Sequence, residues 1–560
     1  MPTPHPTAPD ASCQDSFRWS REAIFHALDD FACPDRPSPR EFARQAGIPP
    51  ATFNYWFRQF SKDPSDPVAS FFCSAPGEEV LRHLLAAALL VFSLRGACGI
   101  RLVREFLQLT HLDRFVACSR GALHSLLVRL EADLVAYRDD VQPALAQQMT
   151  PQAITLVPDE HFHAGKPCLV ALEPLSGFLA VECYRDHRDA DTWTDAIQEG
   201  IAGMPVEVVQ ITSDRARGLL CCAEQGLQAA HSPDLFHGQR DLLGPLLLPL
   251  ARPIQQAEKE LQKVQQQGEK LGSPSSDLLP WEPFVALVES VKEEEAIRKR
   301  LEQARQRKEE ALGQVRGVGD DYHPFDRETG KPVTAPEVGQ RLGTHLDGLE
   351  AVVQAAELGP NATQAVVKAR AWVGTLVGVV AWFWCLARQR VDELDLNEEQ
   401  EQVVYEKLVA GHYWGLAAGR ARTAPERERL KEMAARLKQE AWQEGSALAS
   451  LSEEERTVVE DVARASAGLF QRSSSSVEGR NGRLSLQQHG PSRVSERRLK
   501  ALTVIHNYQV KRSDETTAAE RFFGQKPKGL FNWLLQRMPA LPRPAATRSP
   551  SAPSSLPKAG

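Results

Sequence analysis

Two aspartates stand at the ends of apolar, strand-like runs, where a carboxylate is well placed to bind a ligand. Asp159 closes the run AITLVPD, and Asp214 closes the run VEVVQITSD. In an open sheet, ligands collect just outside the carboxyl ends of the strands. Hard carboxylate oxygens suit Mg²⁺ or Mn²⁺ rather than zinc. The pair therefore predicts a divalent-cation site, although each aspartate taken alone is better explained as a turn former.

A third acid lies far along the chain, in the segment SSSSVEGRNGRLS. This is Glu478, which follows a run of serines. Ser475 lies three residues before it, so the pair also fits a capping box, in which the glutamate folds back on the start of its own helix. The spacing alone leaves the catalytic and the capping interpretation open.

Three segments together resemble the ribonuclease H-like DDE transposases of prokaryotic insertion sequences. They are ITLVPDEHF, VVQITSDRARGL, and SSSSVEGRNGRLSLQQHG with TTAAERFFGQKP downstream. The resemblance covers about residues 150–240 and 471–530. It implies that Asp159 and Asp214 lie on adjacent first and fourth strands, and that Glu478 lies on a later helix.

The chemistry that this resemblance implies is two-metal phosphoryl transfer on DNA. Two Mg²⁺ or Mn²⁺ ions per site, about 3.5–4 Å apart, clamp the attacking and leaving oxygens of an in-line displacement. Asp159 would bridge both ions, and Asp214 and Glu478 would hold one each. The chain departs from one well-known branch of the family at Leu484, where that branch has the lysine of its Tyr-Arg-Glu-Lys motif. Hairpin intermediates and the phosphate handling of that branch are therefore not implied.

Other polar residues near these acids are candidates for contacts with DNA. His237, in LFHGQRD, could approach the scissile phosphate, although a lone histidine more often serves packing. Arg480 and Arg483 could contact backbone phosphates, or they could be solvated surface residues. His161 and His163 share a strand face with the first aspartate and could form a metal site of another kind, for which histidines without cysteine partners are weak evidence.

Residues 17–62 have a helical pattern that predicts a DNA-binding helix-turn-helix. SPREFARQAG carries the start and stop signals of one helix, and PPATFNYWFRQF those of a second. In such a unit the N-terminal residues of the second helix enter the major groove. A helical hairpin without a nucleic-acid partner fits the same pattern. The side chains expected to contact DNA are Thr52, Asn54, Tyr55 and Arg58.

The periodicity of apolar residues predicts a multidomain α plus α/β protein. Patterns between 152 and 240 follow the order β-β-β-α-β-α-β, and the resemblance implies a ribonuclease H-like mixed sheet interrupted by a large all-α insertion. The expected parts are a disordered lead at 1–16, the helix-turn-helix at 17–62, a second helical domain for DNA binding or dimerisation at 77–145, the first part of the sheet domain at 150–240, the helical insertion at 241–470, the last part of the sheet domain at 471–538, and a disordered tail at 539–560.

Charge is distributed unevenly along the chain. The net charge is −7, yet residues 471–560 contain 16 Lys and Arg against 5 Asp and Glu. A phosphate backbone is met by a local basic surface rather than by a net charge. The C-terminal segment is therefore the expected electrostatic partner of DNA.

The sequence shows no clear pattern of export or membrane insertion. The uncharged run at 371–387 approaches the length of a membrane span, about 20 residues, but a helix buried on all sides of a soluble protein gives the same pattern. The N-terminus lacks the pattern of a signal peptide, and the ten cysteines include no CxxC pair. We expect a bacterial cytoplasmic protein associated with the nucleoid.

The expected function is therefore a transposase that binds double-stranded DNA, both element ends and target, as a homodimer or higher oligomer. One alternative is a transposase-derived DNA-binding regulator, which would not need all three acids. Another is a ribonuclease H-like, structure-selective nuclease. The helix-turn-helix favours transposition, because recognition of element ends requires sequence specificity.

Overall fold

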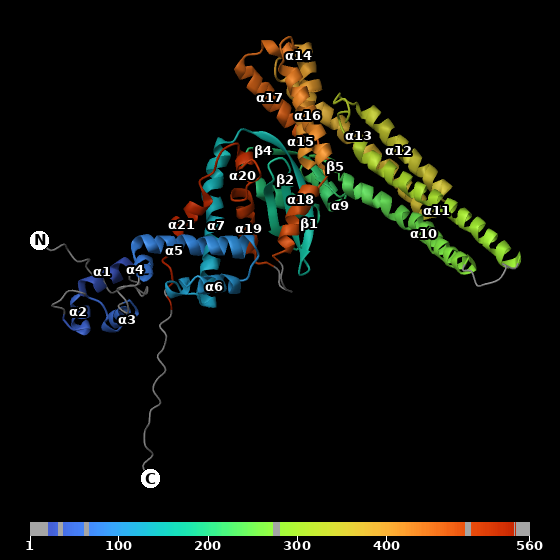
Figure 1. The fold of residues 1–560 in the computed structure, drawn as a ribbon. Coiled ribbons are helices and arrows are strands. Elements are labelled where there is room, and N and C mark those ends of the chain that lie inside the picture. Colours follow the sequence, from blue (N-terminus) through green and yellow to red (C-terminus); the bar gives the residue numbers. More distant parts are fainter. Residues whose placement is uncertain are drawn as a thin grey trace. The chain divides into compact units, whose positions relative to one another are not determined.

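The computed structural model describes residues 21–31, 37–60, 67–272, 281–487, 494–542 and 544, so the expected lead at 1–16 and most of the expected tail lie outside it. The chain divides into two compact units. Met1–Gln148 and Val494–Gly560 form the first, here the helical unit, and Met149–Arg493 form the second, here the sheet unit. Figure 1 shows the elements of both.

Three short helices near the N-terminus confirm the expected helix pair. They are α1 (Arg21–Phe31), α2 (Pro39–Gln45) and α3 (Pro50–Phe60). The Ser38 side chain caps α2 by accepting a hydrogen bond from the Glu41 backbone N–H at 3.3 Å. Gly47 follows with a φ of +66°, a left-handed conformation that glycine adopts without strain. The core between the helices contains Ile24, Phe31, Ala43, Ile48, Phe53 and Trp56.

The rest of the helical unit joins segments from both ends of the sequence. Tyr137 packs edge-on against Tyr508 and Trp533, with ring centroids 5.4 Å apart in each pair. The described residues from Val494 onward therefore pack with the N-terminal helices, and the expectation that the sheet domain extends to 538 is corrected. The remaining helices are α4 (Pro67–Cys73), α5 (Ala75–Ala88), η1 (Leu89–Arg95), α6 (Ile100–Leu109), η2 (Leu112–Arg114), α7 (Arg120–Gln148), α19 (Glu496–Tyr508), α20 (Ala518–Phe523) and α21 (Leu530–Arg537).

A five-stranded mixed sheet begins the sheet unit, with the strand order β3-β2-β1-β4-β5. β1 pairs antiparallel with β2, and β2 pairs antiparallel with β3. β1 and β4 are parallel, as are β4 and β5. The expected order of strands and helices is confirmed. The elements are β1 (Gln152–His163), β2 (Lys166–Glu173), β3 (Phe178–Tyr184), α8 (Ala190–Ile201), β4 (Val206–Ser213), α9 (Arg217–Cys221), η3 (Cys222–Gly226) and β5 (Ala230–Pro233).

Helices fill the sheet unit between β5 and the segment that carries Glu478, as expected. The helical part begins at Leu235 rather than at 241. Its first two helices run antiparallel, because Glu258 pairs with Arg305 and Glu260 with Arg300. The helices are α10 (Leu235–Gly272), α11 (Trp281–Asp321), α12 (Ala335–Ala355), α13 (Pro360–Asp392), α14 (Glu398–Val403), η4 (Val404–Val409), α15 (Ala410–Arg420), α16 (Ala424–Trp442), η5 (Ala447–Ser450) and α17 (Glu453–Gly468), followed by α18 (Ser475–Ser485).

The uncharged run expected to form a buried helix lies within α13. By length and composition, α13 is the one helix in the described part of the chain that could cross a membrane, which is weak evidence for a span. Leu376, Val380 and Phe383 are fully buried in the helical core, whereas Val367 is 61% exposed. The helix is therefore buried along one face rather than on all sides, as in an amphipathic core helix.

Candidate active site

The parallel pairing of β1 with β4 brings two of the three acids to neighbouring strand positions. Leu156 pairs with Ile211, and Asp159 and Asp214 each lie three residues beyond these partners. The sequence predicted that the first strand ends at Asp159. Instead β1 continues past it, because residues 157–163 pair with β2. Asp214 directly follows the end of β4.

Helix α18 packs on β1 and β2 and presents the third acid (Figure 1). Glu478 is exposed in its first turn. The capping box with Ser475 is not formed: the N-cap is Ser474, which makes no side-chain capping bond. The Asn481 amide nitrogen donates a 2.7 Å hydrogen bond to Oδ2 of Asp159. Residues three apart share a helix face, so the face that carries Glu478 is turned toward Asp159.

The electrostatics of Asp159 show that the three acids interact. Burial is the largest cause of its raised pKa, about 6, and the Glu160 backbone N–H opposes that rise. The carboxylates of Asp214 and Glu478 raise the pKa further, whereas His237 lowers it. Like charges that are held near one another disfavour ionisation. The acids therefore form one electrostatic cluster drawn from β1, β4 and α18.

This cluster has the donor chemistry of a divalent-cation site but not a closed arrangement of ligands. Carboxylate oxygens are the ligands that Mg²⁺ prefers. Across the described ranges, no group of three or more His, Cys, Asp or Glu side chains is gathered closely enough to hold a metal ion. Repulsion from Asp214 and Glu478 adds to burial in raising the pKa of Asp159, and a bound divalent cation would relieve that repulsion.

Arg480 fastens α18 to the sheet. Its Nε and Nη2 donate to the two carboxylate oxygens of Glu182 on β3, at 2.6 and 2.5 Å. The side chains of Arg480 and Glu182 are 7% and 0% exposed. The expectation that Arg480 contacts phosphates, or else lies in solvent, is corrected, because the docking of α18 turns this face inward. Arg483 is exposed and stays a candidate for such a contact.

His161 and His163 pack against each other on β1, with ring centroids 4.1 Å apart. Nδ1 of His163 lies 2.6 Å from the hydroxyl oxygen of Tyr184. Burial lowers the pKa of both rings, that of His161 to about 4. Burial therefore favours the neutral form of both rings.

The sequence interpretation missed Asp234, a buried acid directly after β5. Its Oδ2 accepts a hydrogen bond from the Ser474 backbone N–H at 2.6 Å, and its Oδ1 accepts one from the His237 backbone N–H at 3.1 Å. Asp234 thus joins the start of α10 to the segment before α18. Its place at the end of a parallel strand was a usable signal. His237 lies in the first turn of α10, with Nδ1 3.4 Å from Oδ2 of Asp234.

Cavities with basic walls adjoin two of the acids. A cavity of about 1280 Å³ is lined by Asp214, His237 and four cationic side chains, namely those of Arg215, Arg240, Arg252 and Lys368. A second cavity, of about 460 Å³, is lined by Glu478 together with Arg422 and other residues of the helical part. Asp159 lines neither cavity. Cationic walls beside acids suit a polyanion that must approach a metal site.

The candidate DNA-reading residues belong to α3 in the helical unit. Thr52 and Asn54 are half-buried. Tyr55 is also half-buried, and its hydroxyl donates a 3.2 Å hydrogen bond to the carbonyl of Pro544. The side chain of Arg58 lies outside the described residues.

The basic C-terminal segment is partly neutralised within the helical unit. Nε of Arg497 lies 2.9 Å from Oε2 of Glu131, and Nη1 of Arg498 lies 3.9 Å from Oε1 of the same carboxylate. These two cations are therefore less available to phosphates than the excess of Lys and Arg over Asp and Glu in this segment indicated.

Residues 404–550 match a family described as a family of unknown function (DUF6399). No curated protein and no solved structure matches the chain. The matched part includes α18 with Glu478, and neither Asp159 nor Asp214.

Proposed function

We propose that this chain is a DDE-type DNA transposase, a metal-dependent enzyme that cuts DNA at the ends of a mobile element and joins these ends to a target. The observation that carries the proposal is the placement of Asp159 and Asp214 at neighbouring positions of the parallel strands β1 and β4, with Asn481, one helical turn after Glu478, hydrogen-bonded to Asp159. Asp214 taken alone could be a turn former, since its Oδ1 accepts a 3.2 Å hydrogen bond from the Ala216 backbone N–H. Glu478 does not form the expected capping box, and Asp159 lies within a continuing strand rather than in a turn.

The sheet supports a ribonuclease H-like fold for this part of the chain. Its order is β3-β2-β1-β4-β5, with the first three strands antiparallel and β1, β4 and β5 parallel. This order makes the first and fourth strands neighbours, as the resemblance implies. The all-helical segment between β5 and α18 then corresponds to an insertion before the catalytic glutamate.

The proposed chemistry assigns a task to each part of the site. Two Mg²⁺ or Mn²⁺ ions held by the three carboxylates would activate water, and later the DNA 3′-hydroxyl, and stabilise the leaving 3′-oxygen. Asp159 must be ionised to hold a cation, so its raised pKa in the metal-free protein means that protons compete with the cation for this carboxylate. Asn481 orients this carboxylate through Oδ2, and the Arg480–Glu182 pair holds the helix that presents Glu478.

The proposed partner is double-stranded DNA, both as element end and as target. The cations of the larger cavity would contact phosphates beside Asp214, and α3 would read base edges in the major groove. We further propose that the protein acts as a homodimer or higher oligomer on the nucleoid of the bacterial cytoplasm.

A cleavage assay with the full chain, Mg²⁺ and DNA that carries the element ends tests this function. Asp214→Asn should abolish cleavage while end binding persists. The matched control is Asp241→Asn, since Asp241 lines the same cavity but takes no part in the cluster. Equal loss in both variants would contradict the catalytic role of Asp214. End binding by the unaltered protein without cleavage would favour a regulator, and cleavage without joining would favour a nuclease.

A further inference from the structure

The proposed chemistry gives no role to the turn DYHPFDRETGKP at 321–332, which runs from the last residue of α11 toward α12. Asp326 accepts hydrogen bonds from the backbone N–H groups of Glu328 at 3.1 Å and Thr329 at 2.9 Å, and from Nη1 of Arg341 at 2.9 Å. Burial raises the pKa of Asp326, but these bonds outweigh it and lower the pKa to about 2. The conformation of the turn is therefore held by bonds within the turn and by one bond from α12.

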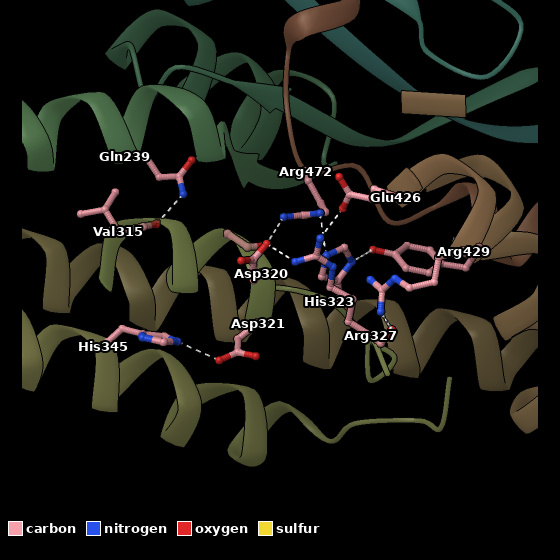
Figure 2. A network of polar contacts seen from close by, with 12 residues as sticks. Gln239, Val315, Asp320, Asp321, His323, Arg327, His345, Glu426, Arg429 and Arg472 are labelled. Carbon is pink, nitrogen blue, oxygen red and sulfur yellow. Dashed lines mark hydrogen bonds and ion pairs between the residues drawn. The ribbon is translucent and has the colours of Figure 1, made fainter. Parts of the chain in front are cut away.

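This turn carries a buried histidine that bridges two other segments (Figure 2). Nδ1 of His323 lies 2.5 Å from the hydroxyl oxygen of Tyr413 on α15. Its Nε2 lies 2.7 Å from Nη1 of Arg472. Arginine can only donate hydrogen bonds, so Nε2 is the acceptor and His323 is neutral. Burial, assisted by the nearby Arg472 and Arg327, holds the pKa of His323 well below its usual value, which agrees with this assignment.

Arg472 lies in the short segment between α17 and α18. Its Nη2 also donates to the carbonyl of Gly319 at the end of α11. The backbone carbonyl of Arg472 accepts a 2.9 Å hydrogen bond from the Leu235 N–H at the start of α10. Two residues later, Ser474 is bound to the buried Asp234. The segment that leads into α18 is thus fixed through its backbone by Asp234, directly after β5, and by Leu235 at the start of α10. The Arg472 side chain fixes it to the end of α11 and to the turn that follows.

We propose that Arg472 is a positioning residue, through which the turn at 321–332 fixes the start of α18 and so the place of Glu478. Glu478 follows Arg472 by six residues, in the first turn of that helix. The helical insertion then acts on the active site through its own fold, whether or not it contacts DNA. The catalytic role of Glu478 rests on the proposed function, whereas the positioning of α18 through Arg472 does not.

Hydrogen exchange of the full chain, followed by mass spectrometry, tests the placement without any activity. His323→Ala should speed exchange in peptides from 473–485 by about tenfold, the loss expected for one hydrogen bond to a charged group. Arg472→Met should speed it at least as much, because it removes the bonds to both His323 and Gly319. His323→Gln keeps an acceptor for Arg472 and should restore most of the protection. His345→Gln is the matched control, because His345 bonds to Asp321 and Gln314 in the same network and does not contact Arg472 (Figure 2).

A second readout separates positioning from general stability. In the cleavage assay, His323→Ala should raise several-fold the Mg²⁺ concentration needed for half-maximal rate, with DNA affinity unchanged. Unaltered exchange at 473–485 in both Arg472→Met and His323→Ala would overturn the proposal, as would an equal increase in His345→Gln. Should His323→Ala not fold, Arg472→Lys, which keeps the charge but loses the fork geometry, decides by the same exchange measurement. If the unaltered chain has no cleavage activity, the proposed function fails while the exchange test still stands.

Discussion

The buried pair of Arg480 and Glu182 should respond to substitution in a way that surface ion pairs do not. Arg480→Met removes the cation that donates hydrogen bonds to both carboxylate oxygens of Glu182, whose side chain is 0% exposed. Breaking a buried pair from one side costs about 3–5 kcal/mol, because the remaining charge stays desolvated. Replacing both residues, as Arg480→Met with Glu182→Leu, removes both charges and should recover most of that stability.

The free energy of opening is measured by native-state hydrogen exchange in rising urea, read on peptides from β3 and α18. The matched control is Arg370→Met, since Arg370 pairs with Asp347 and Glu350 while its side chain is 42% exposed. This control should cost less than about 1 kcal/mol. A cost for Arg480→Met no larger than that of the control would refute the reasoning. The reasoning would also be refuted if the double variant had as low a free energy of opening as the less stable of the two single variants.

Three further predictions concern pH, salt and sequence recognition. The raised pKa of Asp159 means that the folded state disfavours its ionised form. In metal-free protein, Asp159→Asn should therefore raise the urea midpoint at pH 8 and change it little at pH 4; the reverse pH order would contradict the raised pKa. Neutralising Arg240 and Arg252 in the larger cavity should reduce the dependence of log affinity on log salt by about 0.9 per lost phosphate contact, and an unchanged slope would place these contacts elsewhere. Asn54→Ala with Arg58→Ala should weaken binding to element ends by about 1–3 kcal/mol per base contact, while a competition assay shows unchanged affinity for scrambled DNA; equal loss of both would make α3 a backbone clamp or a structural hairpin.

Local signals predicted local structure well. Ser38 and Gly47 marked the ends of α2, because capping and left-handed glycine are decided within a few residues. The change from helical to strand-like periodicity gave the order of the five strands. It also placed the end of the fourth strand at Asp214, within one residue of the end of β4 at Ser213, since the end of a strand is visible in its own residues.

Features that depend on docking were not predictable in the same way. The direction of Arg480 follows from how α18 lies on the sheet, and its sequence neighbours do not encode this. β1 continues past Asp159 because β2 offers a partner there, which single-strand periodicity does not reveal. The attachment of residues beyond Val494 to the N-terminal helices likewise depends on long-range packing, such as that of Tyr137 on Trp533.

Strand transfer by a Glu478→Gln variant tests the central claim most directly. Supplying pre-cleaved element ends, Mg²⁺ and target DNA isolates the joining step, and end binding is measured in the same samples. Glu453→Gln is the matched control, an acidic residue in the first turn of the preceding helix α17. The proposed active site predicts that Glu478→Gln binds ends normally and yields no joined product, while Glu453→Gln joins them as the unaltered protein does. Joined product from Glu478→Gln at the level of the control would contradict the assignment of Glu478 as the third catalytic acid.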